Sequence, residues 1–326
     1  MEGKRRAARL WAVLAVCMML LLDGCAFQDA TDVVVREDST KKSLKEGASS
    51  GIKYTIYLIT MNQASNYWQM IDAGCKKAVK EIGGIDYRWR APPKTDIAEQ
   101  RECIDEAVEA HANAILISAA SETELNDSLA AAVAAGVKLI YVDSTATQEA
   151  IATLATDNVA AGRTAARTMQ RALAAAGITE GTIGLAAGGS GQATNQRDKG
   201  FREGFSGTAF RVAPTFNMDG DQQNIKRAVR EHPDYVAFFG ANEQTTWALS
   251  SQAYESGIHP IIVGFDTSDR TLDMMQKGVI YATLQQKPQQ MGYDGIRIAV
   301  EALEGKYTRA DAVTDMGITV ITRDKI

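Results

Sequence analysis

Strand-like and helix-like segments alternate along nearly the whole chain from residue 52 onward. Short runs rich in β-branched and aromatic residues, such as 54–60, predict strands. Each is followed by a segment with apolar residues at helical spacing, such as 66–82. Successive strands joined by helices must be parallel, with helices covering both faces of the sheet. The alternation therefore predicts an α/β protein.

The strand–helix series occurs twice. The strands expected in the first series are 54–60, 85–90, 114–118, 138–142 and 151–155, with helices at 66–82, 96–110 and 122–135. The second series has strands at 182–186, 211–216, 235–239, 261–264, 280–284 and 318–321, with helices at 158–176, 196–205, 222–231, 244–256, 271–277 and 290–303. No linker rich in Pro, Gly or Ser separates them. We therefore expect two doubly wound parallel-sheet lobes joined by short crossings.

The N-terminal segment has the pattern of an export signal. Four basic residues precede an apolar run at 10–22, which is shorter than the roughly 20 residues that span a bilayer. The run ends in Leu22-Asp23-Gly24-Cys25, which resembles a bacterial lipobox. We expect residues 1–24 to be a lipoprotein signal peptide and Cys25 to carry a lipid; an ordinary signal with a chance cysteine is the alternative. Residues 25–51 are polar and are expected to form a flexible linker.

Composition and cysteine usage exclude several classes of protein. The net charge of −5 provides no basic field, so a nucleic-acid partner is not expected. Cys75 and Cys103 fall in helices expected on opposite faces of one sheet, which favours two buried free thiols over a disulfide. The chain has no CxxC pair and its three histidines are scattered, so neither a metal site nor a cofactor is predicted.

Polar and aromatic residues gather where predicted strands end. In open α/β sheets ligands bind beyond the carboxyl ends of the strands. The candidate ligand-binding residues there are Ser65, Asn66, Tyr67, Trp68, Asp143, Arg197, Asn242, Asp266 and Gln286. Carboxylate, amide and guanidinium groups form paired hydrogen bonds that match vicinal sugar hydroxyls, and aromatic rings cover the C–H faces of a sugar. Structural alternatives remain open: an aspartate can cap a helix, Arg197 can lie on a surface, and Trp68 can belong to the core.

From Ile52 onward the chain resembles the periplasmic ribose-binding protein family, the type I solute-binding proteins of sugar ABC transporters. The resemblance is carried by Leu154-Ala-Thr-Asp-Asn158, Arg197-Asp-Lys-Gly200, Phe239-Gly-Ala-Asn242-Glu243, Val263-Gly-Phe-Asp266 and Thr283-Leu-Gln-Gln286. It implies a three-crossing hinge between an N-terminal lobe, residues 52–156 plus 287–315, and a C-terminal lobe, residues 157–286 plus 316–326. It also implies stacking by Tyr67 and Trp68. Hydroxyl contacts are implied for Asp143 in the first lobe and for Arg197, Asn242, Asp266 and Gln286 in the second lobe and hinge.

Two departures from the family pattern bear on the ligand. Asp143-Ser144 stands where ribose binders carry Asp-Arg, and a second-lobe aromatic of the family falls near Gly220. The loop before Tyr67 is also longer, so Ser65, Asn66 and Asn62 are alternatives for the family's loop amide. We therefore expect a sugar or polyol other than ribose.

The expected mechanism is hinge closure over the ligand, followed by delivery to a membrane ABC permease. The alternative is a ligand sensor that docks onto a histidine kinase or chemoreceptor. A monomer is expected. No nucleophile–base pair or dinucleotide fingerprint is visible, so an enzyme is not predicted. A transcriptional regulator of the LacI type would need a helix-turn-helix where this chain has the export signal and the polar linker.

Overall fold

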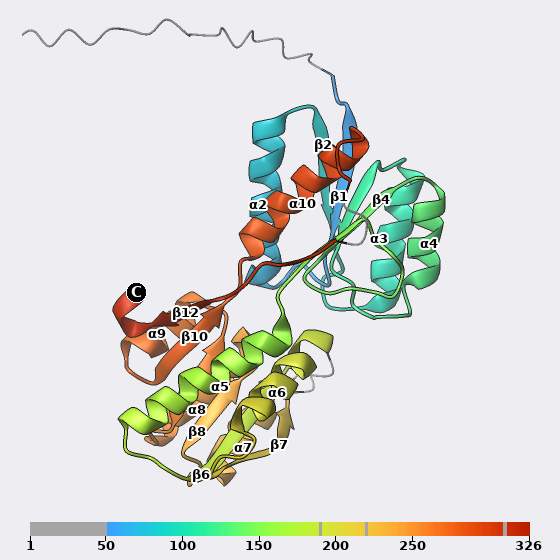
Figure 1. Cartoon of the computed structure of the whole chain (residues 1–326). Coiled ribbons are helices and arrows are strands. Elements are labelled where there is room, and N and C mark those ends of the chain that lie inside the picture. The colour runs from blue at the N-terminus through green and yellow to red at the C-terminus, as the bar shows by residue number, and fades with distance from the viewer. Residues whose placement is uncertain (1–50, 189–190, 219–220, 309–311) are drawn as a thin grey trace, which may run out of the picture. The chain divides into compact units, whose positions relative to one another are not determined.

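The computed structural model of the chain describes residues 51–188, 191–218, 221–308 and 312–326 (Figure 1). The expected signal peptide at 1–24, the expected lipid-bearing Cys25 and most of the expected linker lie outside these ranges, as does Gly220. Among the described residues, no helix has the length and apolar character needed to cross a membrane.

The first sheet is six-stranded and parallel, with the order β11-β5-β4-β3-β1-β2. Its strands are β1 (Tyr54–Ile59), β2 (Ile85–Arg90), β3 (Ala114–Ile117), β4 (Lys138–Val142), β5 (Ala152–Ala155) and β11 (Ala312–Asp315). One face is covered by α2 (Asn66–Ile82) and α10 (Pro288–Leu303), the other by α3 (Ile97–Glu109) and α4 (Asn126–Ala134). We call this sheet with its four helices the first lobe.

The second sheet repeats this order as β12-β10-β9-β8-β6-β7. Its strands are β6 (Gly181–Ala187), β7 (Phe210–Asn217), β8 (Ala237–Gly240), β9 (Ile261–Phe265), β10 (Ile280–Gln285) and β12 (Thr319–Thr322). One face is covered by α5 (Asn158–Ala175) and α6 (Gln192–Phe205), the other by α7 (Gln222–Glu231), α8 (Glu243–Ser256) and α9 (Asp269–Gln276). We call this the second lobe; a 3-10 turn, Arg323–Lys325, follows β12.

Burial on both faces explains why the central strands are apolar along their length. All four residues of β3 and of β8 are buried, as expected where helices cover both sides of a parallel sheet. Helix starts follow the local sequence: Asp96, Asp157, Asp221 and Ser268 each accept a backbone N–H in the first turn of the helix that they precede. Local capping and periodicity therefore agree with the tertiary arrangement.

In each lobe, the two helices on one face cross at a pair of glycines. A Cβ atom on Gly292 of α10 would lie 2.0 Å from the carbonyl oxygen of Ile71 in α2. In the second lobe, a Cβ atom on Gly162 of α5 would lie 2.2 Å from the carbonyl oxygen of Arg197 in α6. Both distances are far below van der Waals contact, so only glycine permits these crossings. The crossings fix α2 and α6, the helices that follow the first strand of each lobe.

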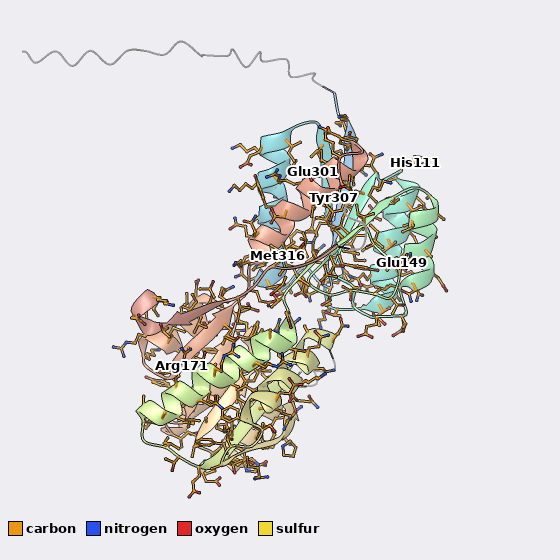
Figure 2. All side chains as sticks on the ribbon, in the orientation of Figure 1. His111, Glu149, Arg171, Glu301, Tyr307 and Met316 are labelled. Carbon is orange, nitrogen blue, oxygen red and sulfur yellow. The ribbon has the colours of Figure 1, made fainter. Side chains whose placement is uncertain are left out.

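The chain passes from one sheet to the other three times: after β5, after β10 and between β11 and β12. Met316, labelled in Figure 2, lies on the third passage; it is buried among the core residues of the first lobe, and its N–H donates to the carbonyl of Ala155 at 2.8 Å. These passages confirm the expected class of fold, two doubly wound lobes joined by crossings. The exact domain boundaries remain predictions.

The structure corrects several local expectations. The helix expected at 122–135 begins only at Asn126, because residues 122–125 form turns. The helices expected from residues 196 and 290 begin earlier, at Gln192 and Pro288. Strand β11 was not predicted, and β12 pairs antiparallel with β10, so the second sheet is not wholly parallel.

The two cysteines of the body are both free. They belong to opposite faces of the first sheet, as expected, because Cys75 packs with α10 and Cys103 packs beside α4. Cys75 is fully buried, and its thiol donates to the carbonyl of Gly292. The expectation of burial is wrong for Cys103, which is only half-buried at the edge of the core on that face.

Candidate functional site

Two aspartates occupy equivalent positions in the two lobes. Asp143 directly follows β4 and Asp266 directly follows β9, the third strand in the order of each sheet. Both have a left-handed backbone, with φ of 70° and 58°. Their N–H groups donate to Leu154 on β5 and Leu284 on β10, at 2.8 and 2.9 Å. Left-handed non-glycine residues are uncommon and gather at functional sites, so this repeated geometry marks both carboxylates as candidates.

Gln286 holds the second-lobe carboxylate at the start of the passage to α10. Its side-chain Nε2 donates to Asp266 Oδ2 at 2.9 Å, and its backbone N–H donates to Asp266 Oδ1 at 3.2 Å. Both residues are buried, with 4% and 9% of their surface exposed. Asp266 therefore has a fixed orientation, set by a residue of the hinge passage.

The same glutamine also contacts residues outside the second lobe. Its Oε1 accepts hydrogen bonds from the hydroxyl of Thr156 at 3.0 Å and from that of Tyr67 at 3.4 Å. The Tyr67 hydroxyl lies closer to Asp143, whose Oδ1 is 2.9 Å away. Oδ2 of Asp143 accepts from the hydroxyl of Ser144, also at 2.9 Å. Both aspartates are thus connected through Tyr67 and Gln286.

Arg197 is a buried cation, only 3% exposed. Its Nε donates to Asn158 Oδ1 at 2.8 Å, and its Nη1 donates to the carbonyl of Ala241 at 2.9 Å. The guanidinium carbon lies 3.7 Å from the centroid of the Phe265 ring, a cation–π contact. No carboxylate of the described residues lies within ion-pair distance of it. The alternative of a surface arginine is therefore wrong.

Burial dominates the protonation behaviour of these groups. It raises the pKa of Asp266, although the charge of Arg197 and the bonds from Gln286 oppose the shift. It lowers the pKa of Arg197, against the attraction of Asp266 and Asp143. It also raises the pKa of Tyr67 well above its ordinary value, so this hydroxyl remains a donor at physiological pH.

The other predicted residues have mixed environments. Asn242 is half-buried and caps α8, since its Oδ1 accepts from the N–H of Thr245 at 2.9 Å. Ser65 caps α2, and Asn66 is exposed at the start of that helix. Trp68 is 7% exposed and belongs to the core of the first lobe, where its ring meets Tyr67 edge to face. Trp68 therefore lies mainly in the core, as the structural alternative allowed.

Sequence reasoning did not place three polar residues in this network: Ser144, Thr156 and Asn158. Thr156 and Asn158 lie in the block Leu154-Ala-Thr-Asp-Asn158 quoted for the family resemblance, beside the first passage between the sheets. That position was a usable signal. Ser144 was noted only as a lost arginine, and its bond to Asp143 depends on side-chain rotamers.

Two doubly wound lobes, three passages between them and polar side chains at the carboxyl ends of both sheets define a two-lobed, hinged binding protein. The chain belongs to the family described as periplasmic binding protein domain, whose model matches residues 56–307. This confirms the resemblance at the level of the family.

Individual relatives span most of the chain. This chain is 22% identical over 303 residues to the ribose import binding protein RbsB of Bacillus subtilis, and the matched region covers 90% of this chain and 93% of that protein. A carbohydrate transporter solute-binding protein from Agrobacterium radiobacter, solved with D-arabinose, is 27% identical with a TM-score of 0.77, covering 83% of this chain and 95% of its own. A solute-binding protein from Agrobacterium vitis, bound with α-D-tagatopyranose, has the same TM-score and coverage at 24% identity, and it supports the fold alone.

Proposed function

We propose that this chain is an extracytoplasmic receptor that binds a sugar or polyol by closing its two lobes, and passes the ligand to the permease of an ABC importer. Family membership and the ligands named for the relatives support transport of a carbohydrate. The proposed hinge consists of the passages at 156–157, 286–287 and 315–316, with lobes of 52–156 plus 287–315 and 157–286 plus 316–326.

The observation that carries the proposal is the buried guanidinium of Arg197 beside carboxylates with which it forms no ion pair within the described residues. A buried charge is costly unless hydrogen bonds satisfy it. A guanidinium has more donors than the two that Asn158 and Ala241 occupy. An uncharged polyhydroxy ligand suits these groups, because its hydroxyls accept from arginine and donate to aspartate. An anionic ligand would be repelled by Asp143 and Asp266.

The proposed ligand contacts are those expected from the sequence: Ser65, Asn66, Tyr67, Trp68, Asp143, Arg197, Asn242, Asp266 and Gln286. Their contributions are unequal. We expect Asp266 and Arg197 to contribute most, because they are buried and oriented by other side chains. Tyr67 is the main aromatic of the proposed site, whereas Trp68 contributes at most a ring edge because it packs in the core.

Isothermal titration tests the proposal directly. The purified body is titrated with D-ribose, D-allose, D-arabinose, D-tagatose, D-fucose and a set of polyols. We expect one of these other than ribose to bind, with affinity lost in Arg197→Met. Failure of every sugar and polyol to bind would overturn the proposed ligand class, and tight binding of a carboxylated compound would replace it.

We also propose that a lipid on Cys25 holds the protein at a bacterial membrane. The basic segment, the short apolar run and Leu22-Asp23-Gly24-Cys25 support this anchor. The test is mass spectrometry of the protein extracted from membranes of the expressing bacterium. A diacylglycerol-modified N-terminal cysteine is expected, and Cys25→Ser should release the protein from the membrane. An unmodified Cys25 would show that the signal is of the ordinary kind.

A further inference from the structure

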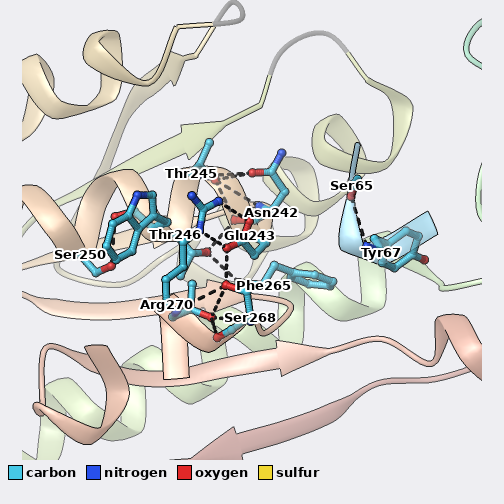
Figure 3. Close-up of polar contacts among 12 residues, drawn as sticks. Ser65, Tyr67, Asn242, Glu243, Thr245, Thr246, Ser250, Phe265, Ser268 and Arg270 are labelled. Atoms are coloured by element: carbon cyan, nitrogen blue, oxygen red, sulfur yellow. Dashed lines mark hydrogen bonds and ion pairs between the residues drawn. The ribbon is translucent and has the colours of Figure 1, made fainter. Parts of the chain in front are cut away.

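Behind the second-lobe ligand residues lies an ion pair that sequence reasoning did not single out. Glu243, the first residue of α8, accepts two hydrogen bonds from Arg270 of α9: Nε to Oε1 and Nη2 to Oε2, both at 2.8 Å. The hydroxyl of Ser268, which caps α9, donates to Glu243 Oε1 at 2.5 Å. Figure 3 shows these bonds converging on the Glu243 carboxylate.

This group of three residues, the Glu243 clamp, joins the two loops that carry proposed ligand residues. Glu243 follows Asn242 directly, and Ser268 is separated from Asp266 by one residue. The clamp therefore links the loop after β8 to the loop after β9. Relative motion of these loops would change the distance between Asn242 and Asp266.

A second, buried link lies beneath the clamp. The Thr246 hydroxyl accepts from the N–H of Phe265 at 3.1 Å and donates to the carbonyl of Asn242 at 2.7 Å. Glycines make room for this side chain, since a Cβ atom on Gly264 would lie 2.1 Å from Thr246 Cγ2. The inner link is locked by packing, whereas the outer link depends on a pair of charges.

The ion pair of the clamp is more buried and more precisely oriented than an ordinary surface ion pair. The Glu243 side chain is 23% exposed and that of Arg270 is 41% exposed. The Arg270 guanidinium lies 5.2 Å from the centroid of the Trp247 ring. Burial works to raise the pKa of Glu243, but the bonds from Arg270 and Ser268 outweigh it and the pKa is lowered. Bidentate arginine–carboxylate pairs add orientation as well as energy.

We propose that Glu243 and Arg270 are positioning residues, which set the spacing of Asn242 and Asp266 for the sugar and do not touch it. This inference rests on the proposed function. Among the ion pairs of the described residues, Lys226–Glu255 provides a matched comparison, because it ties the far end of the same helix α8 to α7. Loss of that pair removes a charge interaction from α8 without touching either ligand loop.

The test compares Glu243→Gln, Arg270→Met and their double variant with Glu255→Gln. Titration uses whichever sugar of the panel the wild type binds. We expect each clamp variant to weaken binding about tenfold, the scale of one charge-assisted hydrogen bond, and the double variant to weaken it no further. Glu255→Gln should bind as the wild type does. Equal affinity of Glu243→Gln and the wild type, or equal weakening by Glu255→Gln, would overturn the proposal.

Hydrogen exchange gives a readout that needs no ligand. In Glu243→Gln, we expect faster exchange of the N–H groups of Phe265 and Asp266, with no change at Asp143 in the first lobe. Unchanged exchange at Phe265 and Asp266 would overturn the proposal even if no sugar binds. A wild type that binds no sugar, with accelerated exchange in the variant, would overturn the ligand class and leave the clamp intact.

Discussion

The two lobes carry an aspartate at the same point of the same strand order but hold it by different means. Asp266 is buried and is bound twice by Gln286, once through the backbone. Asp143 is half-buried, and its side-chain oxygens accept from the hydroxyls of Tyr67 and Ser144. A backbone N–H has a fixed direction, whereas hydroxyls rotate. We infer that the second lobe is pre-organised for its ligand and the first lobe adapts to it.

In both lobes the loop that carries the aspartate is linked to the loop after the neighbouring strand, but the linking groups differ. In the second lobe, Thr246 and the Glu243 clamp link neighbouring strand ends. In the first lobe, the loops after β3 and β4 are joined by hydrogen bonds: the N–H groups of Ala119 and Thr147 donate to the carbonyls of Ser144 and Glu122 at 3.0 and 2.8 Å, and the Asn126 side chain binds Thr147 and Gln148. Pre-organisation reduces the entropy that binding must offset. Because Gln286 binds the Asp266 carboxylate twice, once through the backbone, we expect the second lobe to contribute most of the affinity.

The largest effect is expected where the lobes are most alike, at their glycine crossings. Gly162→Ala and Gly292→Ala both place a methyl group against a backbone carbonyl, at 2.2 and 2.0 Å. Helices must separate to relieve such contacts, so we expect each change to lower the free energy of unfolding by roughly 2–3 kcal/mol in urea denaturation. Gly162→Ala should also weaken sugar binding more, because the affected carbonyl belongs to Arg197.

Gly191→Ala is the control for these variants. Gly191 precedes α6 with a negative φ, and the nearest atom to its Cβ would be Thr194 Oγ1 at 3.7 Å, an ordinary contact. The unfolding free energy of the Gly191→Ala variant should therefore differ from that of the wild type by less than about 1 kcal/mol. If Gly162→Ala is no less stable than Gly191→Ala, the close crossing of α5 and α6 is refuted.

The next largest effect is a difference in sugar affinity between variants of the two aspartates. Asp266→Asn should weaken binding of the panel sugar about 100-fold, and Asp143→Asn about tenfold, because a buried hydrogen bond to a charged group is worth more than an exposed one. Titration calorimetry measures both. Equal losses would contradict the inference that the second lobe is the pre-organised one, and a larger loss in Asp143→Asn would reverse it.

Much of this architecture was predictable from the sequence because local and tertiary signals agree. The predicted bounds of α2, β2, β4 and α7 match the structure. Strand β11 was missed because it is short, its two central residues are exposed, and pairing with β5 orders it. The late start of α4 was missed because no capping residue marks it: Leu125, the residue before the helix, provides no side-chain cap.

The structure brings together several residues that the sequence pointed to, whereas their mutual contacts were not predictable and their contact with a ligand remains a proposal. Two signals pointed to Asp143, Asp266, Arg197 and Gln286: their positions after predicted strands, and the short sequence segments that resemble the ribose-binding family. The hydroxyl network of Tyr67 and the clamp at Glu243 depend on rotamers and on loops brought together by tertiary folding. A sequence pattern identifies neither. It also could not decide between core and ligand for Trp68, since the helical stripe is compatible with both.

A smaller effect tests the adaptable lobe. Tyr67→Phe removes the hydroxyl that joins Asp143 to Gln286, and it should weaken sugar binding roughly fivefold without a large loss of stability. Tyr141→Phe is the matched control, because that hydroxyl donates to the carbonyl of Gln148 at 2.8 Å, outside the network. Comparable affinity losses in the two variants would show that the Tyr67 hydroxyl has no special role.

The smallest effect is a dependence of stability on pH, with opposite signs for two carboxylates of the second lobe. The pKa of Glu243 is lowered by Arg270 and Ser268 against burial, so its ionised form stabilises the fold above the ordinary value of 4.5. That contribution is lost as pH falls through the lowered pKa. Burial raises the pKa of Asp266 above 3.8, so its ionised form costs stability as pH rises through the raised value.

Urea unfolding of the wild type and Glu243→Gln, from neutral pH to below 4.5, separates the two carboxylates. We expect the variant to be less stable by about 1 kcal/mol at neutral pH and the difference to vanish in acid, because the wild-type carboxylate is then protonated. Asp266→Asn should remove the opposite slope and leave the Glu243 contribution in place. The bidentate geometry of the clamp implies that it depends on charge. If Glu243→Gln differs in stability from the wild type by the same amount in acid as at neutral pH, that dependence is contradicted.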